Sequence, residues 1–157
     1  MQRTKVYLAS PLGFSQETRP YLGRIKERLV GMGCEVFDPW AQALFAADIE
    51  RALAIDGFRE RVAAFARIAA GIGELNEAEI READVVIGVL DGAEIDSGTA
   101  SEIGFAAALG KRCYGLRTDV RDCGDFTGIP VNLQVLHFIE RNGGRLFRSI
   151  GEIQICS

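Results

Sequence analysis

Three carboxylates crowd a glycine-containing turn ahead of an alanine-rich helix, in the stretch DGAEIDSGTASEIGFAAALGK from Asp91 to Lys111. A turn uses one Asp or Asn for its backbone, and a helix needs one cap residue, so this segment holds more acid than local structure requires. A carboxylate beside a reacting carbon can act as a nucleophile, and a second acid can supply a proton. The turn is therefore the first candidate for a catalytic site.

Glu102, near the start of the helix expected at 99–109, is the candidate nucleophile, although local structure also explains it. It lies three residues after Thr99, which is the spacing of a capping box in which Thr caps the helix and Glu returns a hydrogen bond. The two roles are compatible, because the helix macrodipole stabilises an ionised carboxylate near the N-terminus and a nucleophile must be ionised. The residues alone leave both roles open.

The rest of the turn has similar alternatives. Asp96 is either an Asx-turn residue or an acid that faces a ligand, whereas Asp91, which a glycine follows, is more typical of a turn residue. Ser97, Gly98 and Thr99 offer hydroxyl and N–H groups suited to an anion at a helix N-terminus, although no GK[ST] follows as in a phosphate loop.

The remaining sequence predicts the elements that position this turn. Amphipathic helices are expected at 21–32, 75–83 and 99–109, and short apolar runs predict strands at 5–9, 34–37, 85–90, 112–118 and, as the last run, 135–139. The segment 41–70 is alanine-rich and broken at Gly57, consistent with one or two helices that cover the sheet or pack on another subunit. Alternating strands and helices predict an α/β fold in one domain, 1–157, with a doubly wound, flavodoxin-like, five-stranded parallel sheet and helices on both faces.

In such a sheet, ligands bind beyond the carboxyl ends of the strands, where the winding direction reverses. If the first and third strands are neighbours, SPLGF after the first and the acidic turn after the third line one crevice. Phe14 is then either a surface-covering residue or a face on which a planar ring stacks. Tyr7, within the first strand, is either core filler or a buried phenol with a hydrogen-bond partner.

Composition limits the class of protein. The chain has 157 residues, 25% of them charged, with a net charge of −4 and a pI near 5.1, which argues against binding of nucleic-acid polymers. No apolar run is long enough for a membrane span and the first residues lack a secretory apolar core, so we expect a cytoplasmic protein. Four cysteines without C-x-x-C spacing and a single histidine give no support to a metal site. Small molecules are the expected partners.

Together these residues resemble the nucleoside 2-deoxyribosyltransferase family. The resemblance spans most of the chain outside 41–70, through KVYLASPLGF, the 76–84 helix ending in AD, VVIGVLDG, DSGTASEIGFAAALGK and PVNLQ. It implies transfer of a 2-deoxyribosyl group between purine or pyrimidine bases, with retention, through a covalent ester on a glutamate. It implies no metal and no organic cofactor.

The family pattern assigns roles to individual residues. Glu102 matches the nucleophile, Tyr7 the residue that orients it, and Asp96 an acid that contacts the nucleobase. Phe14 lies where an aromatic residue stacks on the base. Asn132 matches a residue that a neighbouring subunit lends to the sugar site, which implies a homo-oligomer built from dimers, up to a hexamer.

Two positions differ within the pattern. Asn76 stands where some members carry Asp, which shifts base protonation toward Asp96 or solvent, and Gln134 replaces the methionine of an NLM motif near the sugar. Asp91, Ser97 and Gly98 complete the expected substrate-binding set.

Two rival functions remain open at this stage. One is an N-glycosidase of nucleoside 5′-monophosphates that uses the same glutamate, with Ser97, the helix N-terminus and Arg19 holding the phosphate. The other is a non-catalytic nucleotide-binding module in which Glu102 is only a cap and Asp96 only a turn residue.

Overall fold

The computed structural model describes residues 3–155, and its strands form one parallel sheet. The sheet order is β2-β1-β3-β4-β5, which confirms the expected flavodoxin-like arrangement with β1 and β3 as neighbours. The strands are β1 (Lys5–Ala9), β2 (Glu35–Phe37), β3 (Val85–Val89), β4 (Arg112–Leu116) and β5 (Leu146–Phe147).

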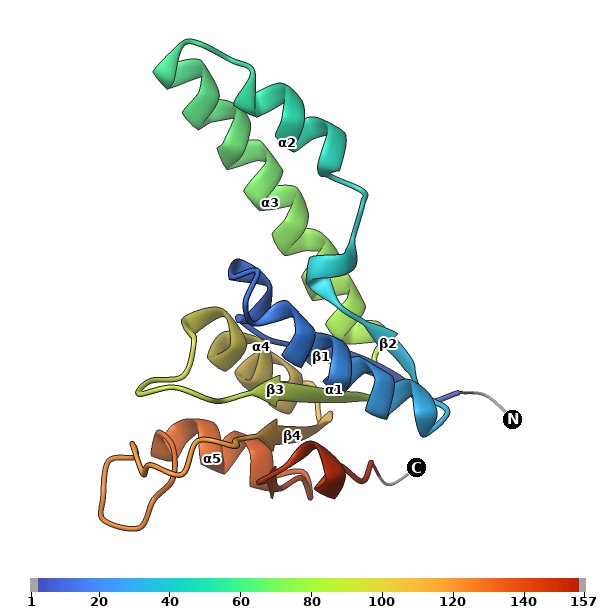
Figure 1. Cartoon of the computed structure of the whole chain (residues 1–157), viewed down its shortest axis with the longest axis vertical. Helices are drawn as coiled ribbons and strands as arrows, with labels where there is room; N and C mark the ends of the chain where they lie inside the picture. The colour runs from blue at the N-terminus through green and yellow to red at the C-terminus, as the bar shows by residue number, and fades with distance from the viewer. Residues whose placement is uncertain (1–2, 156–157) are drawn as a thin grey trace.

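Helices cover both faces of the sheet, as Figure 1 shows. Helix α1 and the short helix η3 pack on one face, while α4, α5 and the C-terminal end of α3 pack on the other. The helices are α1 (Arg19–Gly31), α2 (Ala46–Leu53), α3 (Phe58–Glu82), α4 (Ser97–Ala108) and α5 (Leu133–Glu140), with single turns η1 (Leu12–Phe14), η2 (Pro39–Ala41) and η3 (Ile150–Glu152). No helix among residues 3–155 could cross a membrane.

Strand β3 is buried along its whole length, as its unbroken apolar run predicts for a strand covered on both faces. Gly88, the fourth of its five residues, lets α4 pack closely, because a Cβ there would lie 2.6 Å from Cδ1 of Ile103 and 3.1 Å from Cγ2 of Thr99. This close packing places the start of α4 directly over the carboxyl ends of β1 and β3.

The prediction of a strand at 135–139 is wrong. That run lies in α5, where Val135 and Ile139 are buried one helical turn apart and the Asn132 side chain caps the helix. The fifth strand is the two-residue β5 instead. A short apolar run satisfies the pattern of a buried strand and of a buried helix equally, so periodicity could not separate them.

The segment before β3 forms a projecting arm, defined here as residues 45–75. Gly57 separates α2 from α3, as the predicted break requires, but α3 then continues without interruption to Glu82 and includes the helix expected at 75–83. In Figure 1, α2 and the first half of α3 run side by side away from the sheet, and only the last turns of α3 reach the sheet core. The arm is therefore attached to the sheet at one end.

Candidate active site

Tyr7 and Glu102 form the centre of the site. The Tyr7 hydroxyl donates a hydrogen bond of 2.6 Å to Oε1 of Glu102. Tyr7 points from β1 toward α4, its ring is fully buried, and it stacks on Phe37 at 5.5 Å between ring centroids. A carboxylate on the second turn of a helix is thus held by a phenol on the neighbouring strand.

Burial shapes the ionisation of both groups. Burial raises the pKa of Glu102, the Tyr7 hydrogen bond lowers it, and the nearby Asp96 carboxylate raises it again. The pKa of Tyr7 is raised well beyond its ordinary value, first by burial and then by the Glu102 carboxylate. Tyr7 therefore stays protonated at neutral pH and acts as a hydrogen-bond donor.

Asp96, not Thr99, caps helix α4, so the capping-box alternative for Glu102 does not apply. Oδ2 of Asp96 accepts hydrogen bonds from the Thr99 backbone N–H at 2.9 Å and from Thr99 Oγ1 at 3.2 Å. The cap residue Asp96 lies three residues before Thr99, the cap that the T-x-x-E spacing suggested. Glu102 is thereby released from capping and bonds to Tyr7.

Asp96→Ala should lower the free energy of unfolding by about 1 kcal/mol, because the first turn of α4 loses its cap. Asp96→Asn should leave that free energy nearly unchanged, since an amide oxygen can accept the same bond from Thr99. Urea unfolding of the two variants measures the difference. Equal stability of Asp96→Ala and wild type would show that the cap contributes nothing.

Glu102 lines a pocket of about 420 Å³ that lies between the sheet and the arm. The pocket brings together five of the residues expected from the sequence, namely Phe14, Asn76, Asp96, Gly98 and Glu102. Its other lining residues are Ser10, Pro39, Trp40, Gln42, Phe45, Ile49, Ile72, Leu75 and Thr99. Most of this second set lies in 39–75, where the sequence pattern indicated no candidate.

Trp40 forms a fixed wall of the pocket. Its Nε1 donates to the Ser10 carbonyl at 2.7 Å, and its backbone N–H donates to Oδ1 of Asp38 at 3.0 Å. Phe14, which is 77% exposed, meets the Trp40 ring edge-on with centroids 4.4 Å apart. Gly13 allows this approach, since a Cβ there would lie 1.9 Å from Cδ2 of Trp40. The two rings offer a surface on which a planar base can pack.

The Trp40 wall is anchored through the buried Asp38 carboxylate, whose Oδ2 accepts from Lys26 Nζ at 2.9 Å. Lys26→Met should lower the free energy of unfolding by roughly 1–3 kcal/mol, because it leaves a buried carboxylate without its cation. The control is Arg51→Met, which breaks the exposed ion pair with Asp48 and should cost under about 0.5 kcal/mol. Urea unfolding measures both, and equal losses would contradict the anchoring role.

Asp91 lies outside the pocket, where it holds a loop. Its Oδ1 accepts from the backbone N–H groups of Thr118 and Asp119 at 2.6 and 2.8 Å, and its Oδ2 accepts from the hydroxyls of Thr118 and Tyr21. This ties the loop after β4 to the end of β3. The turn interpretation fits Asp91 better than substrate binding.

Three other expected residues also lie outside the pocket of their own chain. Ser97 is the exposed first residue of α4. Asn132 caps α5 through bonds from the Gln134 and Val135 N–H groups, and it lines a separate hollow of about 340 Å³ beside Glu94 and Cys123. Gln134 is exposed.

Within residues 3–155, no group of three or more His, Cys, Asp or Glu side chains is placed to hold a metal ion. The chemistry available in the pocket is that of a carboxylate held by a phenol, with a second carboxylate and an aromatic wall nearby. Such a set can stabilise or trap a cationic carbon while a planar leaving group packs against the rings.

Residues 6–134 match the sequence profile of a family described as nucleoside 2-deoxyribosyltransferase. This range includes Tyr7 and every residue that lines the pocket. No curated protein sequence matches the chain.

Solved structures share the fold over nearly the whole chain. A conserved protein from Enterococcus faecalis V583 is 28% identical with a TM-score of 0.67, covering 96% of this chain and 94% of that one. A 2-deoxyribosyltransferase from Leishmania mexicana is 24% identical with a TM-score of 0.63, covering 93% and 91%. A CMP N-glycosidase from Clostridium botulinum is 17% identical with a TM-score of 0.51, covering 95% and 94%. The last two similarities concern the fold alone.

Proposed function

The chain belongs to the nucleoside 2-deoxyribosyltransferase family, and we propose that it transfers a 2-deoxyribosyl group between nucleobases through a covalent ester on Glu102. The observation that carries this proposal is the 2.6 Å hydrogen bond from Tyr7 to Glu102 at the inner end of an aromatic-walled pocket. A capping glutamate would bond to the helix start, whereas this one is held by a strand on the pocket side.

In the first half-reaction, a Glu102 oxygen bonds to the anomeric carbon of the nucleoside while the carbon–nitrogen bond breaks. The bonding electrons leave with the glycosidic nitrogen of the base, and the base takes up a proton from Asp96 or from solvent. Asp96 supports that step, because its Oδ2 is bound by Thr99 and its Oδ1 accepts no hydrogen bond from residues 3–155. The oxocarbenium character of the sugar is stabilised by the Glu102 carboxylate throughout.

In the second half-reaction, a nitrogen of the incoming base attacks the anomeric carbon and the Glu102 carboxylate leaves. Two inversions give net retention, and the incoming base loses its proton to Asp96 or to solvent. Tyr7 donates to Glu102 in the free enzyme, so it orients the carboxylate and limits the rise in its pKa that burial causes. Trp40 and Phe14 pack against the base in both half-reactions.

Chromatography of reactions containing 2′-deoxyinosine and free adenine tests the proposal. Formation of 2′-deoxyadenosine by the wild type, absent with Glu102→Gln, is the expected result. Parallel reactions with dAMP and with deoxycytidine, each with and without adenine, separate the rivals. Base release only from the monophosphate would show that the protein is a nucleotide N-glycosidase. The absence of a reaction with any donor would favour a non-catalytic nucleotide-binding module.

We further propose that Asn132 completes the pocket of a neighbouring subunit. In its own chain it lies in a separate hollow, so a contribution to the sugar site requires a second copy. Sedimentation equilibrium of the purified protein tests this, and a monomer at assay concentration that retains full activity would contradict it.

A further inference from the structure

The pocket changes character along its length. Asp96, Asn76 and Glu102 gather at the inner end, whereas the end formed by the arm is lined by four half-buried apolar side chains, Phe45, Ile49, Ile72 and Leu75. Ile72 lies four residues before Asn76 on α3, which is about 6 Å along the helix axis. The apolar end therefore begins about one helical turn beyond the polar end.

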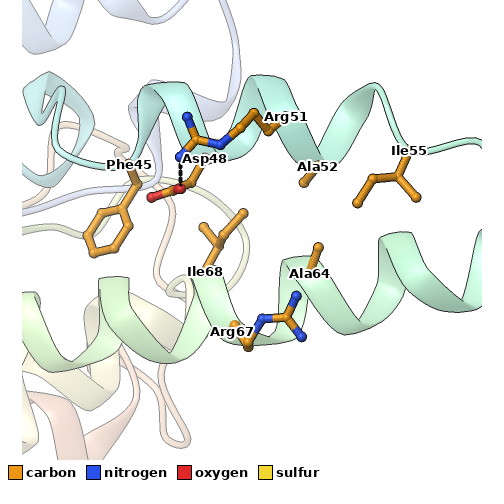
Figure 2. A pocket seen from close by; sticks show the side chains of 8 residues that line it. All are labelled: Phe45, Asp48, Arg51, Ala52, Ile55, Ala64, Arg67 and Ile68. Atoms are coloured by element: carbon orange, nitrogen blue, oxygen red, sulfur yellow. Dashed lines mark hydrogen bonds and ion pairs between the residues drawn. The ribbon is translucent and has the colours of Figure 1, made fainter.

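A second hollow of about 350 Å³ lies beyond the apolar end, between α2 and α3 (Figure 2). Phe45 lines both the pocket and this outer hollow, and Figure 2 shows its ring at one end of the outer hollow. The ring lies against α3 at Gly71, where an added Cβ would come within 2.8 Å of Cε1 of Phe45. The outer hollow is lined by Ala52, Ala64 and Ile68 between the helices, with Arg51 and Arg67 at its edges.

The reaction fixes which part of a base meets the apolar end. The glycosidic nitrogen must face Glu102, so the six-membered ring of a purine, with its substituent at C6, points toward the arm. An unmodified adenine or hypoxanthine presents a polar edge there, and the four apolar side chains offer it no hydrogen bond. Burying a polar group without a partner is unfavourable, whereas burying an apolar substituent is favourable.

We propose that the preferred bases of this enzyme are purines that carry an apolar substituent on the C6 amino group, such as an aryl or alkyl chain. The substituent packs between Ile49 and Ile72 and ends against the Phe45 ring. This inference rests on the proposed transferase function, because the orientation of the base follows from attack at Glu102. In this inference, side chains of the arm determine which bases the enzyme prefers. The arm lies mostly in the part of the chain that carries least of the family pattern.

The test compares adenine with N6-benzyladenine as acceptors from 2′-deoxyinosine. We expect kcat/KM to be roughly tenfold higher or more for N6-benzyladenine, because a buried phenyl ring gains about that much from removal of its surface from water. Equal or lower kcat/KM for N6-benzyladenine, with active transfer to adenine, would overturn the inference while leaving the proposed function intact.

Two matched variants locate the effect. Ile49→Phe fills the apolar end and should reduce kcat/KM for N6-benzyladenine at least fivefold more than for adenine, on the order of the gain that it displaces. Ile68→Phe places the same bulk in the outer hollow, beyond Phe45, and should leave the ratio of the two acceptors unchanged. A ratio that responds equally to both variants would contradict packing of the substituent in the pocket.

Binding without turnover separates the two proposals. Trp40 is the single tryptophan of the chain and lines the pocket, so its fluorescence reports occupancy by a free base. If no acceptor reacts but N6-benzyladenine binds at least about tenfold more tightly than adenine, the transferase proposal fails and the apolar subsite stands. If adenine binds as tightly as N6-benzyladenine, the apolar subsite fails whatever the activity.

Discussion

Glu102→Gln should lower kcat for base transfer by roughly 10⁴-fold or more, the scale seen when an enzyme loses its nucleophile. The amide is nearly the same size as the carboxylate, and its oxygen can still accept the Tyr7 hydrogen bond. It cannot form the ester with the anomeric carbon. Initial rates of 2′-deoxyadenosine formation from 2′-deoxyinosine and adenine measure the loss.

Glu102→Gln should keep or raise the stability of the protein, although it lowers kcat. Because the folded protein raises the pKa of Glu102 above that of the unfolded chain, the protonated form is favoured by folding. The free energy of unfolding is therefore highest below the unfolded pKa and falls as the pH rises through the folded pKa. Gln does not ionise, so the variant does not lose free energy of unfolding as the pH rises. Glu102→Gln should therefore unfold at the same temperature as wild type, or at a higher one, at neutral pH.

These two measurements together exclude a trivial explanation of lost activity. A variant that is inactive but at least as stable as wild type has lost chemistry and kept its fold. Intact-protein mass spectrometry of wild type mixed with donor alone should show a deoxyribosyl adduct that Glu102→Gln lacks. An adduct on the variant, or transfer activity within about tenfold of wild type, would show that Glu102 is not the nucleophile.

The closeness of Tyr7 to the acidic segment was predictable because its signals lie in β1, β3 and the turn that follows β3. The order of the strands follows from alternating elements, and that order brings Tyr7 on β1 beside the turn after β3. Three of the four acidic residues in the stretch 91–111 make separate contacts. Glu102 bonds to Tyr7, Asp96 caps α4, and Asp91 holds the loop after β4.

The apolar half of the pocket was not predictable from the same reasoning. Ile49, Ile72 and Leu75 have the spacing of ordinary helix residues that face a core, and a helical pattern does not say which body the apolar face will meet. The Trp40 wall depends on a contact with the distant Gly13 loop. The sequence thus predicted the positions of Tyr7 and Glu102 better than the apolar lining of the pocket beside them.

Tyr7→Phe should move the acidic limb of the kcat/KM pH profile upward by on the order of one pH unit. The nucleophile must be ionised, and the Tyr7 hydrogen bond is the contact that lowers the pKa of Glu102 against burial and the Asp96 charge. Removing the hydroxyl leaves only contributions that raise the pKa, so a larger fraction of Glu102 is protonated at any given pH. Near neutral pH, kcat/KM should fall by up to about tenfold, which is the most that a shift of one pH unit can remove from the ionised fraction of Glu102.

The matched control is Tyr21→Phe, which also removes a phenol hydrogen bond to a carboxylate, that of Asp91, outside the pocket. Both variants keep their aromatic rings, but Tyr7→Phe should lose more stability in urea unfolding, because Asp91 keeps three other hydrogen bonds and Glu102 keeps none from residues 3–155. Only Tyr7→Phe should move the acidic limb, because only Tyr7 contacts the group that must ionise. If the limb stays in place in Tyr7→Phe, or moves equally in both variants, then Tyr7 packs the core without tuning the nucleophile.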